Sequence, residues 1–136
     1  MKEKFSIAVD RARGLVRITM SGLLTLGDVD EFYKTRRDAH AALGLPKNAH
    51  LTLNDVRALN ILPQETLAAF CEMLADPDYH SRRLAFVVGP TLVRAQVVRA
   101  LGGRGNARCF NDVAEAEAWL LEEEVPAVPL RRAIGS

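Results

Sequence analysis

The chain has 136 residues, of which 49% are hydrophobic and 26% charged, and its formal net charge is +1. This length fits one domain, and the composition supports a real core, which excludes a disordered chain. With 18 basic and 17 acidic residues there is no electrostatic reason to expect nucleic acid as a partner. No apolar run is long enough to cross a bilayer and no apolar signal segment opens the chain, so we expect a cytoplasmic protein without membrane insertion.

The first half of the chain predicts two strands, a helix and a third strand. Apolar residues alternate over 5–9 and again over 16–20, with turn residues between, which predicts an antiparallel hairpin. From about Thr25 the apolar period becomes helical, beginning with Leu26 in the expected inner stripe. Alternation returns over 51–56 and predicts a strand.

The second half repeats the order helix and strand twice and adds a final helix. A helix is expected from Pro63, and the unbroken apolar run 84–88 is typical of a central strand covered on both faces. The next helix has Leu92 as the first residue of its apolar stripe, and a short strand follows at 107–110. The last helix begins after Asp112.

These elements predict an α/β fold: a small mixed sheet of about five strands with four helices, in the order ββαβαβαβα. Strands that alternate with helices are expected to be parallel and joined by right-handed crossovers, beside one antiparallel pair from the opening hairpin. We expect residues 1–124 to form one domain. Residues 125–136 contain two prolines and no clear period, which favours a loose C-terminal tail.

A search for catalytic chemistry finds no candidate. The three histidines, His40, His50 and His80, lacking metal-ligand spacing, are expected at the surface. Neither Cys71 nor Cys109 has the exposed, electropositive setting of a reactive thiol, and no nucleophile elbow is present. We therefore predict no catalytic residue, no metal and no cofactor.

Polar residues do follow the predicted parallel strands, at the edge where open α/β sheets bind ligands. Asp55 and Arg57 lie near the end of one strand, and Thr91 and Arg94 follow the next. Two interpretations stand: these groups converge on one binding rim, or they serve the fold, with Asp112 capping a helix and Asp55 pairing with Arg57 or with a neighbouring backbone group. The second is favoured, because caps and turns always need such residues.

The order of elements resembles the STAS-like superfamily, the fold of anti-sigma factor antagonists, which is related to small bacterial STAS/CRAL-TRIO-like domains. The segments that carry the resemblance are Phe5-Ser6-Ile7, Leu51-Thr52-Leu53-Asn54-Asp55-Val56-Arg57, Arg83-Leu84-Ala85-Phe86-Val87-Val88 and Phe110-Asn111-Asp112-Val113-Ala114-Glu115-Ala116-Glu117-Ala118-Trp119-Leu120. The resemblance covers nearly all of residues 5–123.

The resemblance implies a protein that binds partners or small ligands and performs no reaction. In the antagonists, a kinase phosphorylates a Ser or Thr at the start of the helix after the third strand. Here that segment contains Asn60, Ile61 and Leu62 and no hydroxyl, while Thr66 lies further into the helix. We therefore expect constitutive association through this segment in place of a phospho-switch.

The favoured function is a non-enzymatic regulatory or protein-interaction module that binds a protein partner or itself, as a dimer. The alternative is a protein that binds a small ligand, such as a lipid or another apolar molecule. A filled pocket lined by Phe32, Phe70, Phe86 or Trp119 would favour the alternative. A packed core with an exposed apolar patch would favour the interaction module.

Overall fold

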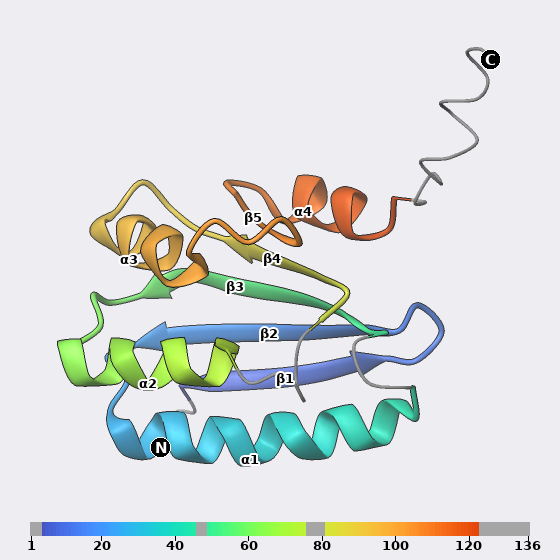
Figure 1. Cartoon of the computed structure of the whole chain (residues 1–136), viewed down its shortest axis with the longest axis horizontal. Helices are drawn as coiled ribbons and strands as arrows, with labels where there is room; N and C mark the ends of the chain where they lie inside the picture. The colour runs from blue at the N-terminus through green and yellow to red at the C-terminus, as the bar shows by residue number, and fades with distance from the viewer. Residues whose placement is uncertain (1–3, 46–48, 76–80, 123–136) are drawn as a thin grey trace, which may run out of the picture.

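The computed structural model describes residues 4–45, 49–75 and 81–122, so the expected tail at 125–136 and His80 lie outside the described residues. Figure 1 shows a single sheet with helices on both sides. The strands are β1 (Phe5–Asp10), β2 (Leu15–Gly22), β3 (Leu51–Leu59), β4 (Arg83–Val87) and β5 (Ala107–Phe110). The helices are α1 (Leu26–Leu43), α2 (Gln64–Ala75), α3 (Leu92–Leu101) and α4 (Val113–Leu120).

The sheet has the strand order β1-β2-β3-β4-β5. β1 and β2 pair antiparallel, with Ile7 opposite Ile18, and the other neighbours pair parallel. The predicted fold class and element order are therefore confirmed. β3 extends to Leu59, beyond the predicted end at Val56, because it keeps pairing with β2 as far as Gly22.

Helices α1, α2 and α3 cover one face of the sheet, and α4 covers the other (Figure 1). The larger core, on the three-helix side, contains Phe32, Phe70 and Phe86. The smaller core packs Leu120 of α4 against Val87 and its neighbours on β3 and β4. Leu84–Val87 are all buried, which confirms the predicted central strand covered on both faces.

Two leucines expected in buried stripes are exposed instead. Leu26 and Leu92, the first residues of α1 and α3, have 47% and 67% of their surface exposed. Val29, one turn after Leu26, and Val97, about one and a half turns after Leu92, are buried. Helical spacing alone assigns Leu92 and Val93 to one stripe, but Val93 is 3% exposed and packs in the larger core, so Leu92 lies on the solvent side of that stripe.

Candidate interaction surface at the carboxyl edge of the sheet

Because β2 to β5 run parallel, the loops that follow them lie along one edge of the sheet. Four large apolar side chains are exposed there and form what we call the rim patch: Leu23, Leu26, Ile61 and Leu92. They follow three neighbouring strands, β2, β3 and β4. Apolar groups exposed together in this way are typical of an interaction site, whereas single exposed leucines are ordinary.

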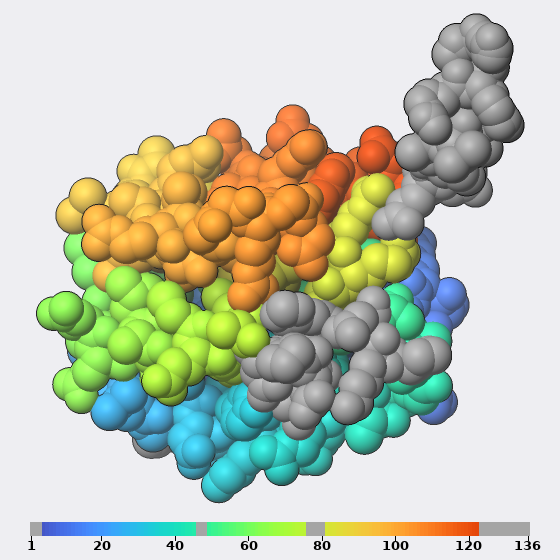
Figure 2. Space-filling view, in the orientation of Figure 1, coloured from blue at the N-terminus to red at the C-terminus, as the bar shows by residue number. Residues whose placement is uncertain are grey.

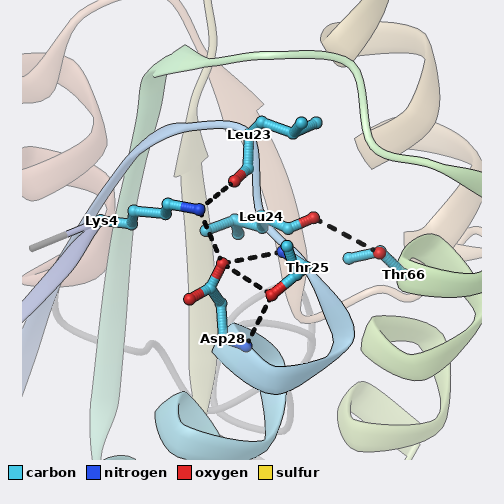
Figure 3. A network of polar contacts seen from close by, with 6 residues as sticks. All are labelled: Lys4, Leu23, Leu24, Thr25, Asp28 and Thr66. Atoms are coloured by element: carbon cyan, nitrogen blue, oxygen red, sulfur yellow. Dashed lines mark hydrogen bonds and ion pairs between the residues drawn. The ribbon is translucent and has the colours of Figure 1, made fainter.

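The entry to α1 is held by a polar network (Figure 3). Thr25 and Asp28 form a reciprocal capping box: the Asp28 N–H donates to Thr25 Oγ1 at 3.2 Å and the Thr25 N–H donates to Asp28 Oδ2 at 2.8 Å. Lys4 Nζ donates to the Leu23 carbonyl at 2.8 Å and pairs with Asp28 at 3.1 Å. The hydrogen bond from the Thr25 backbone is the main reason why the pKa of Asp28 lies below its usual value. The backbone of Leu23 is therefore fixed, while its side chain points away from the network.

Thr66 is not available for modification in the folded chain. Its side chain is 1% exposed, and its hydroxyl donates to the Leu24 carbonyl at 3.4 Å (Figure 3). This contact joins α2 to the loop between β2 and α1. A hydroxyl so deeply buried cannot accept a phosphate without local unfolding.

The segment between β3 and α2 divides into a surface part and a core part. The Asn60 N–H donates to the Gly22 carbonyl at 2.9 Å, and the Ile61 side chain is exposed. Leu62 was expected at the surface, but its side chain is only 6% exposed and packs in the larger core. Its N–H donates to Gln96 Oε1 and its carbonyl accepts from Gln96 Nε2, both at 2.9 Å, so α3 holds the segment in this position.

Asp55 and Arg57 pair with each other at the end of β3. The Arg57 guanidinium donates from Nε and Nη2 to the two carboxylate oxygens, at 2.9 and 2.7 Å. These hydrogen bonds hold the pKa of Asp55 below its usual value and raise the pKa of Arg57. The pair is therefore satisfied within one strand and does not need a ligand.

The other polar residues of the edge are also engaged within the fold. Thr91 caps α3 by accepting from the Val93 N–H at 3.3 Å, and Asp112 caps α4 by accepting from the Ala114 N–H at 2.6 Å. Arg94 Nη1 donates to Asn111 Oδ1 at 3.0 Å. The edge thus combines polar groups that serve the fold with apolar groups that face solvent.

The histidines contradict the prediction of surface positions. His50 is 5% exposed and His40 is half-buried, and their ring centroids lie 4.1 Å apart. They form part of an amino-edge cluster of buried or half-buried polar residues, which comprises Arg36, His40, His50, Thr52 and Ser81. Desolvation and, to a smaller extent, neighbouring positive charge lower the pKa of His40 to about 3 and that of His50 to about 4. Sequence reasoning missed this contact because α1 and the start of β3 meet only in the folded chain.

A small cavity of about 50 Å³ lies in the larger core, and its lining includes Phe32, Phe70, Phe86 and the buried polar residues Asn54 and Arg36. Cys71 and Cys109 are free thiols and half-buried, and burial raises the pKa of Cys109. Within the described ranges, no three His, Cys, Asp or Glu side chains are grouped closely enough to hold a metal ion.

Comparison with solved structures gives the fold. The chain is similar to an uncharacterised protein of the DUF3478 family with a SpoIIAA-like fold from Shewanella loihica PV-4, with 20% identity, a TM-score of 0.68, and coverage of 88% of this chain and 96% of the other. It is also similar to an anti-sigma factor antagonist from Mycobacterium paratuberculosis, with 12% identity, a TM-score of 0.58, and coverage of 90% and 98%. No family model and no curated protein matches the sequence. The predicted STAS-like fold is confirmed.

The helices of this fold are short or amphipathic. In the part of the chain that the structure describes, none has the length and apolar character needed to span a membrane.

Proposed function

We propose that this protein is a non-enzymatic regulatory module of the STAS-like type, which acts by associating with protein through its carboxyl edge. The observation that carries the proposal is the rim patch, because its four exposed apolar side chains follow three neighbouring strands at one edge of the sheet. The fold is shared with an anti-sigma factor antagonist, which supports a role in protein association. The polar residues of this edge do not require a ligand, since the hydrogen-bond partners described above for Asp55, Thr91 and Arg94 all lie within the chain.

The association is constitutive in this proposal. Thr66 is buried, and Asn60, Ile61 and Leu62 carry no hydroxyl that a kinase could modify. Ile61 instead presents an apolar side chain at the position where a phosphate would add nearly two negative charges. Concentration of the partners, and not modification, then sets the bound fraction.

A small apolar ligand is the less favoured function. The cavity beside Phe32, Phe70 and Phe86 has a volume of about 50 Å³, whereas an engineered core cavity that binds benzene has about 150 Å³. The core is therefore close to fully packed. A packed core with an exposed apolar patch is the combination that favours an interaction module.

The test compares Ile61→Asp with Leu121→Asp. Both leucine-sized side chains are exposed, but Leu121 follows α4 and belongs to the opposite end of the sheet. Light scattering of the purified chain, and capture of partners from a lysate of the source organism, would be run on both variants and on the wild type. We expect Ile61→Asp to lose association and Leu121→Asp to keep it, with unchanged circular dichroism. Equal association of all three proteins would show that the rim patch is not the binding surface.

A further inference from the structure

The three-helix face of the molecule carries a second feature, a groove between α1 and α2. Its volume is about 330 Å³, and its lining mixes apolar residues with Tyr33 and two acids, one from each helix: Asp30 of α1 and Glu72 of α2. Asp30 also pairs with Lys34, one turn further along α1, at 3.4 Å between two exposed side chains. The apolar lining includes Leu26, Val29 and Met73. Leu26 also belongs to the rim patch, so the groove and the patch are continuous.

The outer face of α3, on the same side of the sheet, has the opposite charge. Leu92 and Val98 are 67% and 53% exposed, and Ala95 between them is exposed. Helical spacing places Arg94 and Arg99 on the two sides of Ala95 and Val98. α3 thus has an exposed apolar face bordered by two arginines, and the groove has a partly apolar lining that includes two acids.

The arrangement of the helices allows both contacts to form at once. α2 contacts α1 on one side and α3 on the other, and Figure 2 shows α1 in cyan, α2 in green and α3 in orange across one surface. If a second copy packs face to face about a twofold axis along α2, the groove of each copy meets α3 of the other. A twofold contact of this kind closes on itself and yields a dimer, not a filament.

We propose that the chain forms a twofold dimer in which α3 of each copy lies in the α1–α2 groove of its partner. Arg94, which donates to Asn111 within its own chain, and Arg99 face Asp30 and Glu72 across the interface, while Leu92 and Val98 pack on the apolar part of the groove. This inference rests on the proposed function and names the associating partner as a second copy of the chain. Rim residues Leu26 and Leu92 are buried by the same contact.

Charge reversal tests the pairing directly. One variant reverses the groove (Asp30→Lys with Glu72→Lys), and another reverses the helix (Arg94→Glu with Arg99→Glu). Like charges then oppose each other in both homodimers, so light scattering should give the monomer mass for each variant alone. An equimolar mixture restores opposite charges in both contacts, and the dimer mass should return. The matched control, Glu115→Lys with Glu122→Lys on the α4 side, changes two acids to lysines and should remain dimeric.

Each outcome supports or overturns the pairing. Dimer formation by the mixture but by neither variant alone supports it, as does weakening of the wild-type dimer by added salt. The pairing is wrong if the wild type is monomeric up to about 1 mM, because a dimer with a dissociation constant at or below that concentration would then be detected. It is also wrong if the reversed variants behave like the control, or if folded variants stay monomeric when mixed. If Ile61→Asp abolishes association but the reversals do not, the proposed function stands and only the α3 pairing falls.

Discussion

The two edges of the sheet use polar and apolar residues in opposite ways. At the amino edge, polar side chains are buried: Ser81 Oγ lies 2.6 Å from Thr52 Oγ1 and 3.2 Å from His50 Nε2. At the carboxyl edge, polar side chains are paired near the surface and apolar ones, such as Ile61, are exposed. A buried polar group lowers the stability of the fold unless it is hydrogen-bonded. An exposed apolar group has little effect on the stability of the fold, and it favours association when a partner covers it. The amino edge therefore bears on folding, and the carboxyl edge is free to serve recognition.

The largest effect that we expect is a difference in the free energy of unfolding between a substitution in the core and one at the carboxyl edge. Phe86 is central in β4 and 8% exposed, so Phe86→Ala should lower the free energy of unfolding by about 3–5 kcal/mol. Ile61→Ala removes a smaller apolar group at an exposed site and should change the free energy of unfolding by less than about 0.5 kcal/mol. Urea titration measures both. A loss below about 1 kcal/mol for Phe86→Ala would show that β4 is not the centre of the core.

The amino edge should make stability depend on pH. The pKa of His50 is about 4 and that of His40 about 3 in the folded chain, against 6.5 for an unperturbed histidine. The unfolded chain therefore binds protons below pH 6.5 that the folded chain does not, so stability is full above this pH and falls toward pH 4. Each group contributes at most about 1.4 kcal/mol per pH unit. With a discount for half-buried His40, we expect a loss of roughly 2 kcal/mol between about pH 7.5 and 5.5.

Urea titrations across this range would measure the loss, with His50→Gln as the comparison. Glutamine keeps a hydrogen-bonding group near Ser81 but does not titrate, so the pH dependence should fall by about half. Stability that stays level from about pH 7.5 to 5.5 in the wild type would contradict the buried, neutral state of the pair.

How much of this could be predicted from the sequence depends on how local each feature is. The strand alternation over 5–9 and the apolar run over 84–88 are local, and both strands were predicted correctly. The Asp55–Arg57 pair joins residues two positions apart and was one of the two pairings expected for Asp55. The exposure of a side chain depends on segments that are distant in the sequence. Leu26 was expected to be buried and is exposed, whereas Leu62 was expected to be exposed and is buried.

Contacts between distant segments are even harder to predict from the sequence. Gln96 bonds to a residue 34 positions away, and His40 meets His50 only when α1 packs on the sheet. A glutamine within a helix is typically an exposed residue, so nothing in its neighbours indicates a structural role. The groove between α1 and α2 likewise depends on the packing of two helices.

The smallest predicted effect concerns Gln96 and tells whether the carboxyl edge is preformed. The Gln96 amide satisfies both backbone groups of Leu62 and so fixes the loop that carries Ile61. Gln96→Ala leaves these groups to water or unpaired, which should cost about 1–2 kcal/mol. The exposed Gln64 offers a matched control, since Gln64→Ala should cost less than about 0.5 kcal/mol.

Hydrogen exchange adds a local measurement: the Leu62 amide should exchange faster in Gln96→Ala, while amides of the buried β4 strand keep their relative protection. If the Leu62 amide exchanges equally fast in wild type and Gln96→Ala, the loop is not held by this side chain, and Ile61 is ordered only when a partner binds.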